Sequence, residues 1–151
     1  MKFAPQLKAS ALAAVLAFAC AGSAVAAMDK AAMKAEKDRI ADQYKTAKAA
    51  CKDMKGNAKD VCKKEADGKH KVAKAEAEVK EHDTPKNRLK VHEAKAEAQY
   101  DVAKERCDDQ KGDAKDACQK AAKAERDGAI AQARKASLDS EGRTKESRRK
   151  E

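Results

Sequence analysis

Two cysteine pairs with the same spacing constrain this chain more than any other feature of its sequence. Ten residues separate Cys51 from Cys62, and Cys107 and Cys118 repeat the arrangement 56 residues later. Of the 23 residues at positions 44–66, 13 are identical to their counterparts in the second copy. This identity indicates an internal duplication, so both copies are expected to fold into the same unit.

Each cysteine pair has a turn signal at its midpoint, Gly56–Asn57 in the first copy and Gly112–Asp113 in the second. Glycine readily takes the left-handed conformation that ends a helix, and Asn or Asp can cap the helix that follows. The two cysteines of a pair would then lie level with each other in a helical hairpin. A disulfide at that point would stabilise the hairpin by about 3 kcal/mol.

A second geometry is also compatible with this spacing. Cys51 and Cys62 are 11 positions apart, which is almost three helical turns, so a helix running straight through Gly56 would place both on one face. Two such helices packed antiparallel would form crossed pairs, Cys51 with Cys118 and Cys62 with Cys107, as in the twin-cysteine hairpins of the mitochondrial intermembrane space. The midpoint glycine favours the turn, because it costs about 1 kcal/mol inside a helix.

The composition predicts helices throughout the central part of the chain. Alanine, lysine and glutamate, which are strong helix formers, dominate residues 30–136, and β-branched runs are absent from the sequence. Thr84 as N-cap and Pro85 at the first helical position mark a helix start. The expected breaks fall at residues 55–57, 82–87 and 111–113.

The predicted fold is therefore all-α, with four helices in two tandem disulfide-linked hairpins. The first hairpin covers residues 27–84 and the second covers residues 85–136. Tyr44 and Tyr100, two turns before the first cysteine of each pair, are expected to fill the helix seams. The hairpins would pack as a thin four-helix bundle or form an elongated rod. Residues 137–151 lack periodicity and are predicted to be a disordered charged tail.

The first 26 residues have the organisation of a secretory signal peptide. Two lysines precede an uncharged apolar run at residues 9–21, and small residues follow it. Ala24 and Ala26 occupy the cleavage positions, so residues 1–26 are predicted to be removed and Ala27 to begin the mature chain. The apolar run is shorter than the ~20 residues that span a bilayer, so we expect no transmembrane span after cleavage.

Cleavage also removes Cys20 and leaves four cysteines, an even number. A lipoprotein signal ending at Cys20 is disfavoured, because the preceding residues lack the aliphatic side chain that a lipobox prefers. In an oxidising compartment, an even number of cysteines is typical of disulfides. The predicted location is the periplasm or the extracellular space.

The segment from Ala50 to Ala66 and its copy resemble the repeated motif of a family of small exported proteobacterial proteins. That motif is a cysteine, ten residues containing Gly-Asn/Asp-Ala-Lys-Asp, and a second cysteine, and it matches this chain from Cys51 to Cys62 and from Cys107 to Cys118. The resemblance implies a periplasmic location and no catalytic activity. The Ala/Lys/Glu-rich stretches also resemble in composition the helical linker of the envelope-spanning protein of the Tol system.

The residues themselves also favour a protein without catalysis. Thin alanine-rich helices offer little enclosed volume, and no nucleophile motif or phosphate-binding loop is present in the sequence. Redox pairs usually have two residues between their cysteines, and zinc sites use similarly short spacings. A spacing of ten fits neither, so we expect no enzyme activity, no cofactor and no metal. His82 and His92 flank Pro85 and are interpreted as exposed histidines of a polar linker.

The net charge points to an acidic partner. Loss of Lys2 and Lys8 lowers the number of basic residues from 35 to 33, against 26 acidic ones, which leaves a net charge of +7. This excess is spread along the chain without base-stacking aromatics, so no nucleic-acid partner is expected.

The expected function is a structural or interaction role at the cell envelope, including a stress-related one. Its partners would be anionic envelope polymers, lipid headgroups or an envelope protein. The alternative is a periplasmic binding or chaperone-like module that accepts an apolar helix on its alanine-rich faces. The oligomeric state stays open.

Overall fold

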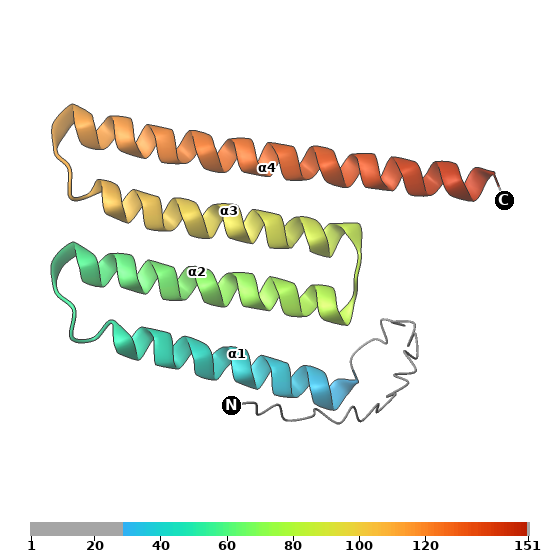
Figure 1. Ribbon diagram of the computed structural model, residues 1–151, viewed down its shortest axis with the longest axis horizontal. Coiled ribbons are helices and arrows are strands. Elements are labelled where there is room, and N and C mark those ends of the chain that lie inside the picture. Colours follow the sequence, from blue (N-terminus) through green and yellow to red (C-terminus); the bar gives the residue numbers. More distant parts are fainter. Residues whose placement is uncertain (1–28, 151) are drawn as a thin grey trace, which may run out of the picture.

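The computed structural model of the chain describes residues 29–150, which form four antiparallel α-helices (Figure 1). They are α1 (Lys30–Ala50), α2 (Gly56–Glu81), α3 (Pro85–Cys107) and α4 (Gly112–Arg149). This part of the chain contains no strand, so the predicted all-α fold with four helices is confirmed. The predicted signal peptide and its cleavage residues Ala24, Ala26 and Ala27 lie outside the described residues.

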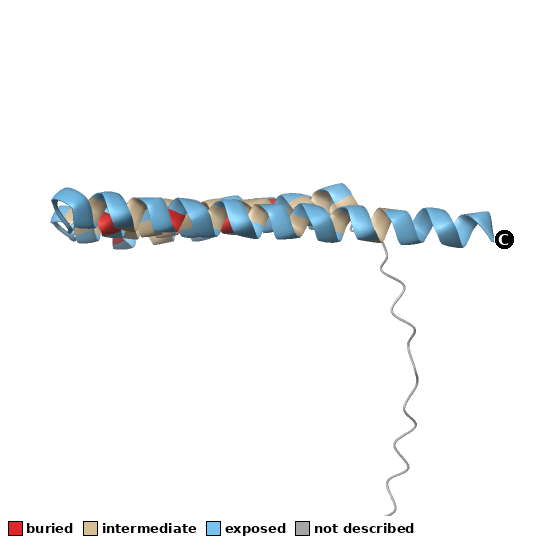
Figure 2. Cartoon of the chain, turned by 90° about the horizontal axis from the view of Figure 1, so that it is seen from above, coloured by how far each residue is buried: buried red, intermediate tan, exposed pale blue. Residues whose placement is uncertain are grey.

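The helices lie side by side in a single layer. Along the described residues each helix packs only against its neighbours in the chain, with α2 and α3 joining the two hairpins. Seen from above, the array is thin (Figure 2). Neither expected packing describes it, because a bundle requires α1 to approach α4 and a rod requires the hairpins to stand apart.

The start of α3 follows its sequence signal. The Thr84 hydroxyl accepts a hydrogen bond from the backbone N–H of Asn87 at 3.1 Å, and Pro85 opens the helix. The Asp29 carboxylate caps α1 in the same way, accepting from the N–H of Ala32 at 2.7 Å. These caps satisfy N–H groups that have no partner within their own helix.

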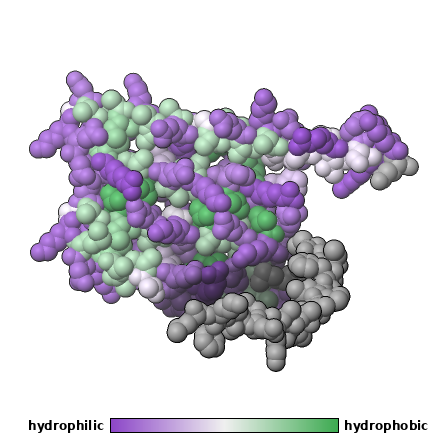
Figure 3. Space-filling view, in the orientation of Figure 1, coloured by the Kyte–Doolittle hydropathy of each residue, from purple (hydrophilic) through white to green (hydrophobic). Residues whose placement is uncertain are grey.

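The core is thin and built mostly from small side chains. Within residues 29–150, Met33 and Ile40 of α1 are the only large buried aliphatic residues, and they cluster with Ala77 of α2. Between α2 and α3, Gly68 faces Ala98 so closely that a Cβ on Gly68 would lie 2.7 Å from the Ala98 Cβ. Hydrophobic residues therefore remain visible among hydrophilic ones on the face of the layer in Figure 3.

The predicted disordered tail is wrong for the described residues, because α4 continues to Arg149. Residues 137–149 contain no proline, and Gly142 is their only glycine, so the helix meets no strong breaker. The end of α4 extends past the other helices (Figure 1). The missing apolar stripe indicates that this segment has no packing partner. A helix without a packing partner can still be folded.

Candidate functional site

Both disulfides join the two helices within a hairpin. Cys51 pairs with Cys62 and Cys107 with Cys118, and the two Cα atoms lie 5.7 Å apart in each pair. The hairpin pairing is confirmed and the crossed pairing is wrong, because the chain turns at each glycine instead of running straight through it. Cys51 and Cys107 are almost completely buried, at 1% exposure each, so the crosslinks form part of the core.

The two midpoint glycines adopt the left-handed conformation expected of them. Gly56 has a φ of +58° and Gly112 a φ of +55°. They begin α2 and α4, whereas α1 already ends at Ala50 and α3 at Cys107. Residues 51–55 thus form the first turn and residues 108–111 the second, and each glycine directs the chain into the next helix.

Replacing either glycine with alanine is expected to cost about 1–2 kcal/mol of unfolding free energy, the penalty for a left-handed residue with a Cβ. Space is not the obstacle, because a Cβ at Gly56 or Gly112 would meet no atom within 4 Å. Gly56→Asn should cost less than Gly56→Ala, because asparagine tolerates this conformation better. Urea unfolding of Gly56→Ala, Gly112→Ala and Gly56→Asn measures these losses. Equal losses for Gly56→Asn and Gly56→Ala would contradict the backbone explanation.

The predicted capping role of Asn57 and Asp113 is wrong. The N-cap residues are Lys55 and Lys111, and neither makes a side-chain cap hydrogen bond. The Asn57 amide instead donates to the backbone oxygen of Glu105 at 2.8 Å and so connects the two hairpins. Asp113 lies in the first turn of α4, which has no neighbouring hairpin beyond it among the described residues, and its side chain is exposed.

Tyr44 anchors a polar cluster between α1 and α2. Its hydroxyl donates to Asp67 Oδ1 at 2.7 Å, and Lys48 Nζ donates to the same oxygen at 3.1 Å. Burial raises the pKa of Asp67, but these two hydrogen bonds outweigh it and the pKa is lowered overall. The hydrogen bond to Asp67 and burial together raise the pKa of Tyr44. The phenol therefore stays protonated at neutral pH, as a structural donor.

The duplication preserves a second feature that sequence reasoning missed. The Tyr44 ring stacks on the His70 ring, with centroids 4.3 Å apart. At the equivalent positions of the second copy, the Arg126 guanidinium lies over the Tyr100 ring at 4.4 Å. In each copy, a planar side chain from the next helix thus lies against the tyrosine ring. This side chain belongs to the residue 26 positions after the tyrosine. Extending the 56-residue offset beyond the cysteine segment would have revealed this correspondence.

Glu36 accepts hydrogen bonds from basic residues of both α1 and α2. It accepts hydrogen bonds from Arg39 of its own helix at 2.8 Å and from Lys80 of α2 at 2.6 Å. These contacts lower the pKa of Glu36 to about 2. Because the folded-state pKa lies below the value of about 4.3 for an unfolded glutamate, this stabilisation is present above that value and disappears as the pH falls toward the folded-state pKa.

The wild-type protein is therefore expected to melt at a higher temperature than Glu36→Gln at neutral pH. The difference should shrink as the pH is lowered from about 4 toward about 2. Glu125→Gln is the matched control, because Glu125 makes no ion pair among the described residues. Melting temperatures recorded across this range test the prediction, and a pH-independent difference for Glu36→Gln would contradict it.

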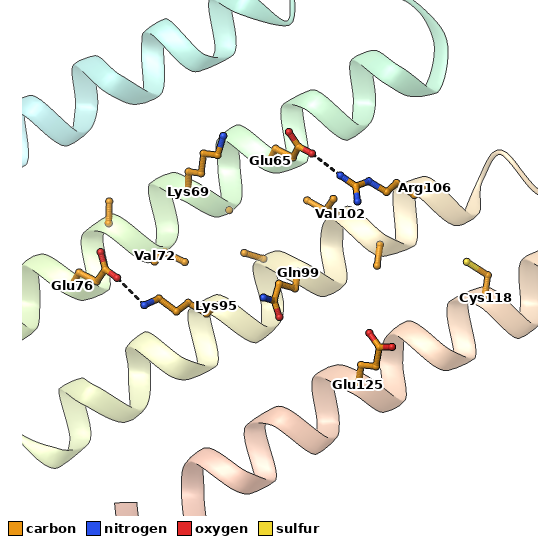
Figure 4. A pocket seen from close by; sticks show the side chains of 14 residues that line it. Glu65, Lys69, Val72, Glu76, Lys95, Gln99, Val102, Arg106, Cys118 and Glu125 are labelled. Atoms are coloured by element: carbon orange, nitrogen blue, oxygen red, sulfur yellow. Dashed lines mark hydrogen bonds and ion pairs between the residues drawn. The ribbon is translucent and has the colours of Figure 1, made fainter. Parts of the chain in front are cut away.

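An open groove runs along the seam between α2 and α3. Its volume is about 760 Å³, and its lining includes Val72 and Val102 with small residues around them. Two ion pairs cross it, Glu65 with Arg106 at 2.8 Å and Glu76 with Lys95 at 2.9 Å (Figure 4). Sequence reasoning missed this groove, because its residues become neighbours only when the hairpins pack.

A second surface is the projecting end of α4. Arg134 makes the last ion pair between α4 and α3 in the described part of the chain, with Glu93 at 3.0 Å. Beyond it, residues 143–150 contain five basic residues and one acidic residue, Glu146, which pairs with Lys150 at 3.2 Å. We call residues 143–150 the basic end. Leu138, which lies before it, is 67% exposed.

The described residues contain no group of three or more His, Cys, Asp or Glu side chains arranged to hold a metal ion. The four cysteines in residues 29–150 are all oxidised, so a zinc site made of four thiolates has no ligands in this state. None of the four helices combines the length and apolar character that crossing a membrane requires.

Comparisons of the chain with protein-family models, with curated proteins and with solved structures find no match. Its class is defined by its own fold, a single-layer array of two disulfide-linked helical hairpins. The disulfides are typical of an oxidising compartment. The resemblance to exported proteobacterial proteins stays a prediction.

Proposed function

We propose that this chain is a non-enzymatic interaction protein of the periplasm that attaches to anionic envelope components through the basic end of α4. The observation that carries the proposal is the concentration of positive charge on a helix end that projects from the layer. The signal-peptide pattern supports export, and the disulfides support an oxidising compartment.

The charge distribution supports this end over the rest of the layer. Across the α2–α3 seam, the basic residues are matched by acidic partners in five ion pairs. Among the described residues, Arg143, Lys145, Arg148 and Arg149 make no ion pair. Clustered bases attract anionic lipid surfaces with about 1 kcal/mol per residue near the surface, and they attract soluble polyanions by the same force.

The test is binding of the oxidised protein to phosphatidylglycerol vesicles and, separately, to soluble polyphosphate. Replacing the four unpaired bases of the basic end with glutamine should weaken binding at least about 100-fold, given the contribution expected per base. Binding of the wild-type protein should also weaken as salt is added, because salt screens exposed charges. Preference for vesicles over polyphosphate would identify headgroups as the natural ligand, and the reverse would identify a polymer.

A matched control neutralises four exposed lysines elsewhere on the layer and so has the same net charge. These lysines are Lys30, Lys52, Lys104 and Lys120. If position matters, this control should bind far more tightly than the variant of the basic end. Equal weakening in both would show that attachment depends on net charge alone, and salt-independent binding would exclude an electrostatic mechanism.

A further inference from the structure

The groove between α2 and α3 has an ordered charge pattern at its ends, and Lys69 of α2 and Glu125 of α4 also line it. On α2 its lining begins and ends with acids, Glu65 and Glu76, and on α3 it begins and ends with bases, Lys95 and Arg106 (Figure 4). Every one of these side chains is at least 40% exposed, despite the two ion pairs across the seam. Each can therefore meet a further charge from outside the layer.

The apolar part of the groove lacks a cover within the described residues. Stable domains usually pack two layers of secondary structure around a common core. Here a single layer leaves Val72 and Val102 only partly buried, beside an open volume of about 760 Å³. A second layer laid on this face would place apolar side chains in that volume and remove them from water.

We propose that the second layer is another copy of this chain, related by a two-fold axis that runs parallel to the helices along the α2–α3 seam. Rotation about this axis exchanges the α2 and α3 sides of the groove. Glu65 then lies opposite the partner subunit's Arg106, and Glu76 lies opposite the partner subunit's Lys95. Each acid faces a base at four points, and the groove valines of both copies lie between these points.

The same charges oppose the other way of stacking two layers. A two-fold axis in the plane of the layer but perpendicular to the helices leaves α2 facing α2 of the partner. Glu65 would then lie opposite the partner subunit's Glu76, and Arg106 opposite the partner subunit's Lys95. Facing like charges is unfavourable, so the charge pattern selects the axis parallel to the helices.

This dimer is closed, because both copies use the same surface and no groove remains open for further addition. Rotation about an axis parallel to the helices preserves their direction. Both basic ends therefore leave the dimer at the same end of the molecule. Dimerisation through this face does not depend on what the basic ends bind.

The experiment measures the mass of the oxidised protein by analytical ultracentrifugation over a concentration series. The wild-type protein is expected to dimerise. The variant E65R/E76K, with four bases around the groove, and the variant K95E/R106E, with four acids, should each raise the dimer dissociation constant at least about 100-fold. An equimolar mixture of the two should form a heterodimer, because all facing charges are then opposite.

The fourfold variant E65R/E76K/K95E/R106E provides the control. It exchanges acids and bases across the seam, keeps both ion pairs within the chain, and should dimerise like the wild-type protein. Mixed with the wild-type protein, it should form no heterodimer about the proposed axis, because acid would face acid. Circular dichroism and melting temperatures establish that every variant is folded.

Several outcomes would overturn the proposal. A wild-type protein that stays monomeric at all concentrations excludes the dimer, and one that instead binds an amphipathic peptide in the groove assigns this face to a different partner. Double variants that dimerise like the wild-type protein would place the contact on another surface. Heterodimers between the wild-type protein and the fourfold variant would exclude the parallel axis.

Discussion

Removing the two disulfides is expected to unfold most of this protein at room temperature. Each disulfide closes a loop with a sequence separation of 11, for which the chain-entropy model gives about 3 kcal/mol. Together they approach the whole stability of a marginal domain, about 5–15 kcal/mol. The core cannot compensate, because Met33 and Ile40 are the only large buried aliphatic side chains among the described residues.

The two hairpins should respond differently to the loss of their disulfides. Helix α4 buries only Ala122, so replacing Cys107 and Cys118 with alanine should release much of it. Helix α1 buries Met33 and Ile40 and should retain more structure without its crosslink. Far-UV circular dichroism and urea unfolding of each double alanine variant measure these effects.

Reductant supplies the control for the disulfide prediction. It should lower the unfolding midpoint of the wild-type protein and have no effect on a variant without the four cysteines. If the wild-type midpoint is unchanged by complete reduction, the crosslinks are not a major source of stability.

Enlarging Gly68 is expected to separate the two hairpins. A Cβ there would lie 2.7 Å from the Ala98 Cβ, which is fixed to its own helix backbone, so α2 and α3 must move apart. Gly68→Leu should cost about 3 kcal/mol, the upper part of the range for overpacking. Gly68→Ala should cost less, because alanine recovers about 1 kcal/mol of helix propensity. Urea unfolding measures both losses.

Two matched variants separate packing from helix propensity. Gly128 lies in α4, where a Cβ would meet no atom within 4 Å, so Gly128→Ala should stabilise the protein. The exchange Gly68→Ala with Ala98→Gly keeps the number of methyl groups at the contact and should recover most of the loss. If Gly68→Ala stabilises as Gly128→Ala does, the close approach of the two helices is not important for stability.

Local signals predicted the hairpins well because the interactions that form them are local. The glycines at positions 56 and 112 mark turns, and each disulfide joins residues only 11 positions apart. The start of α3 was equally predictable, because Thr84 and Pro85 act within a single helical turn. These features depend on the conformation of neighbouring residues and hardly on the rest of the fold.

Local signals failed where a residue's partner lies in a distant segment. Asn57 stands where the sequence predicts a helix cap. Its amide instead donates a hydrogen bond to the backbone oxygen of Glu105 in the other hairpin. The groove could not be predicted either, because Val72 and Val102 line one surface only when α2 and α3 pack. The disorder predicted for residues 137–151 rests on the missing apolar stripe, although a segment without proline can continue a helix without a packing partner.

Backbone preferences and short-range spacing are enough to specify the helices, their turns and the two crosslinks, so these features are already present in the order of the residues. Whether the four helices form an open layer or a closed bundle is decided by tertiary packing. The reason is physical: alanine-rich helices offer no dominant apolar stripe to select one arrangement. The layer instead follows from close approaches such as Gly68 to Ala98 and from ion pairs such as Glu65 to Arg106, whose partners lie in different hairpins.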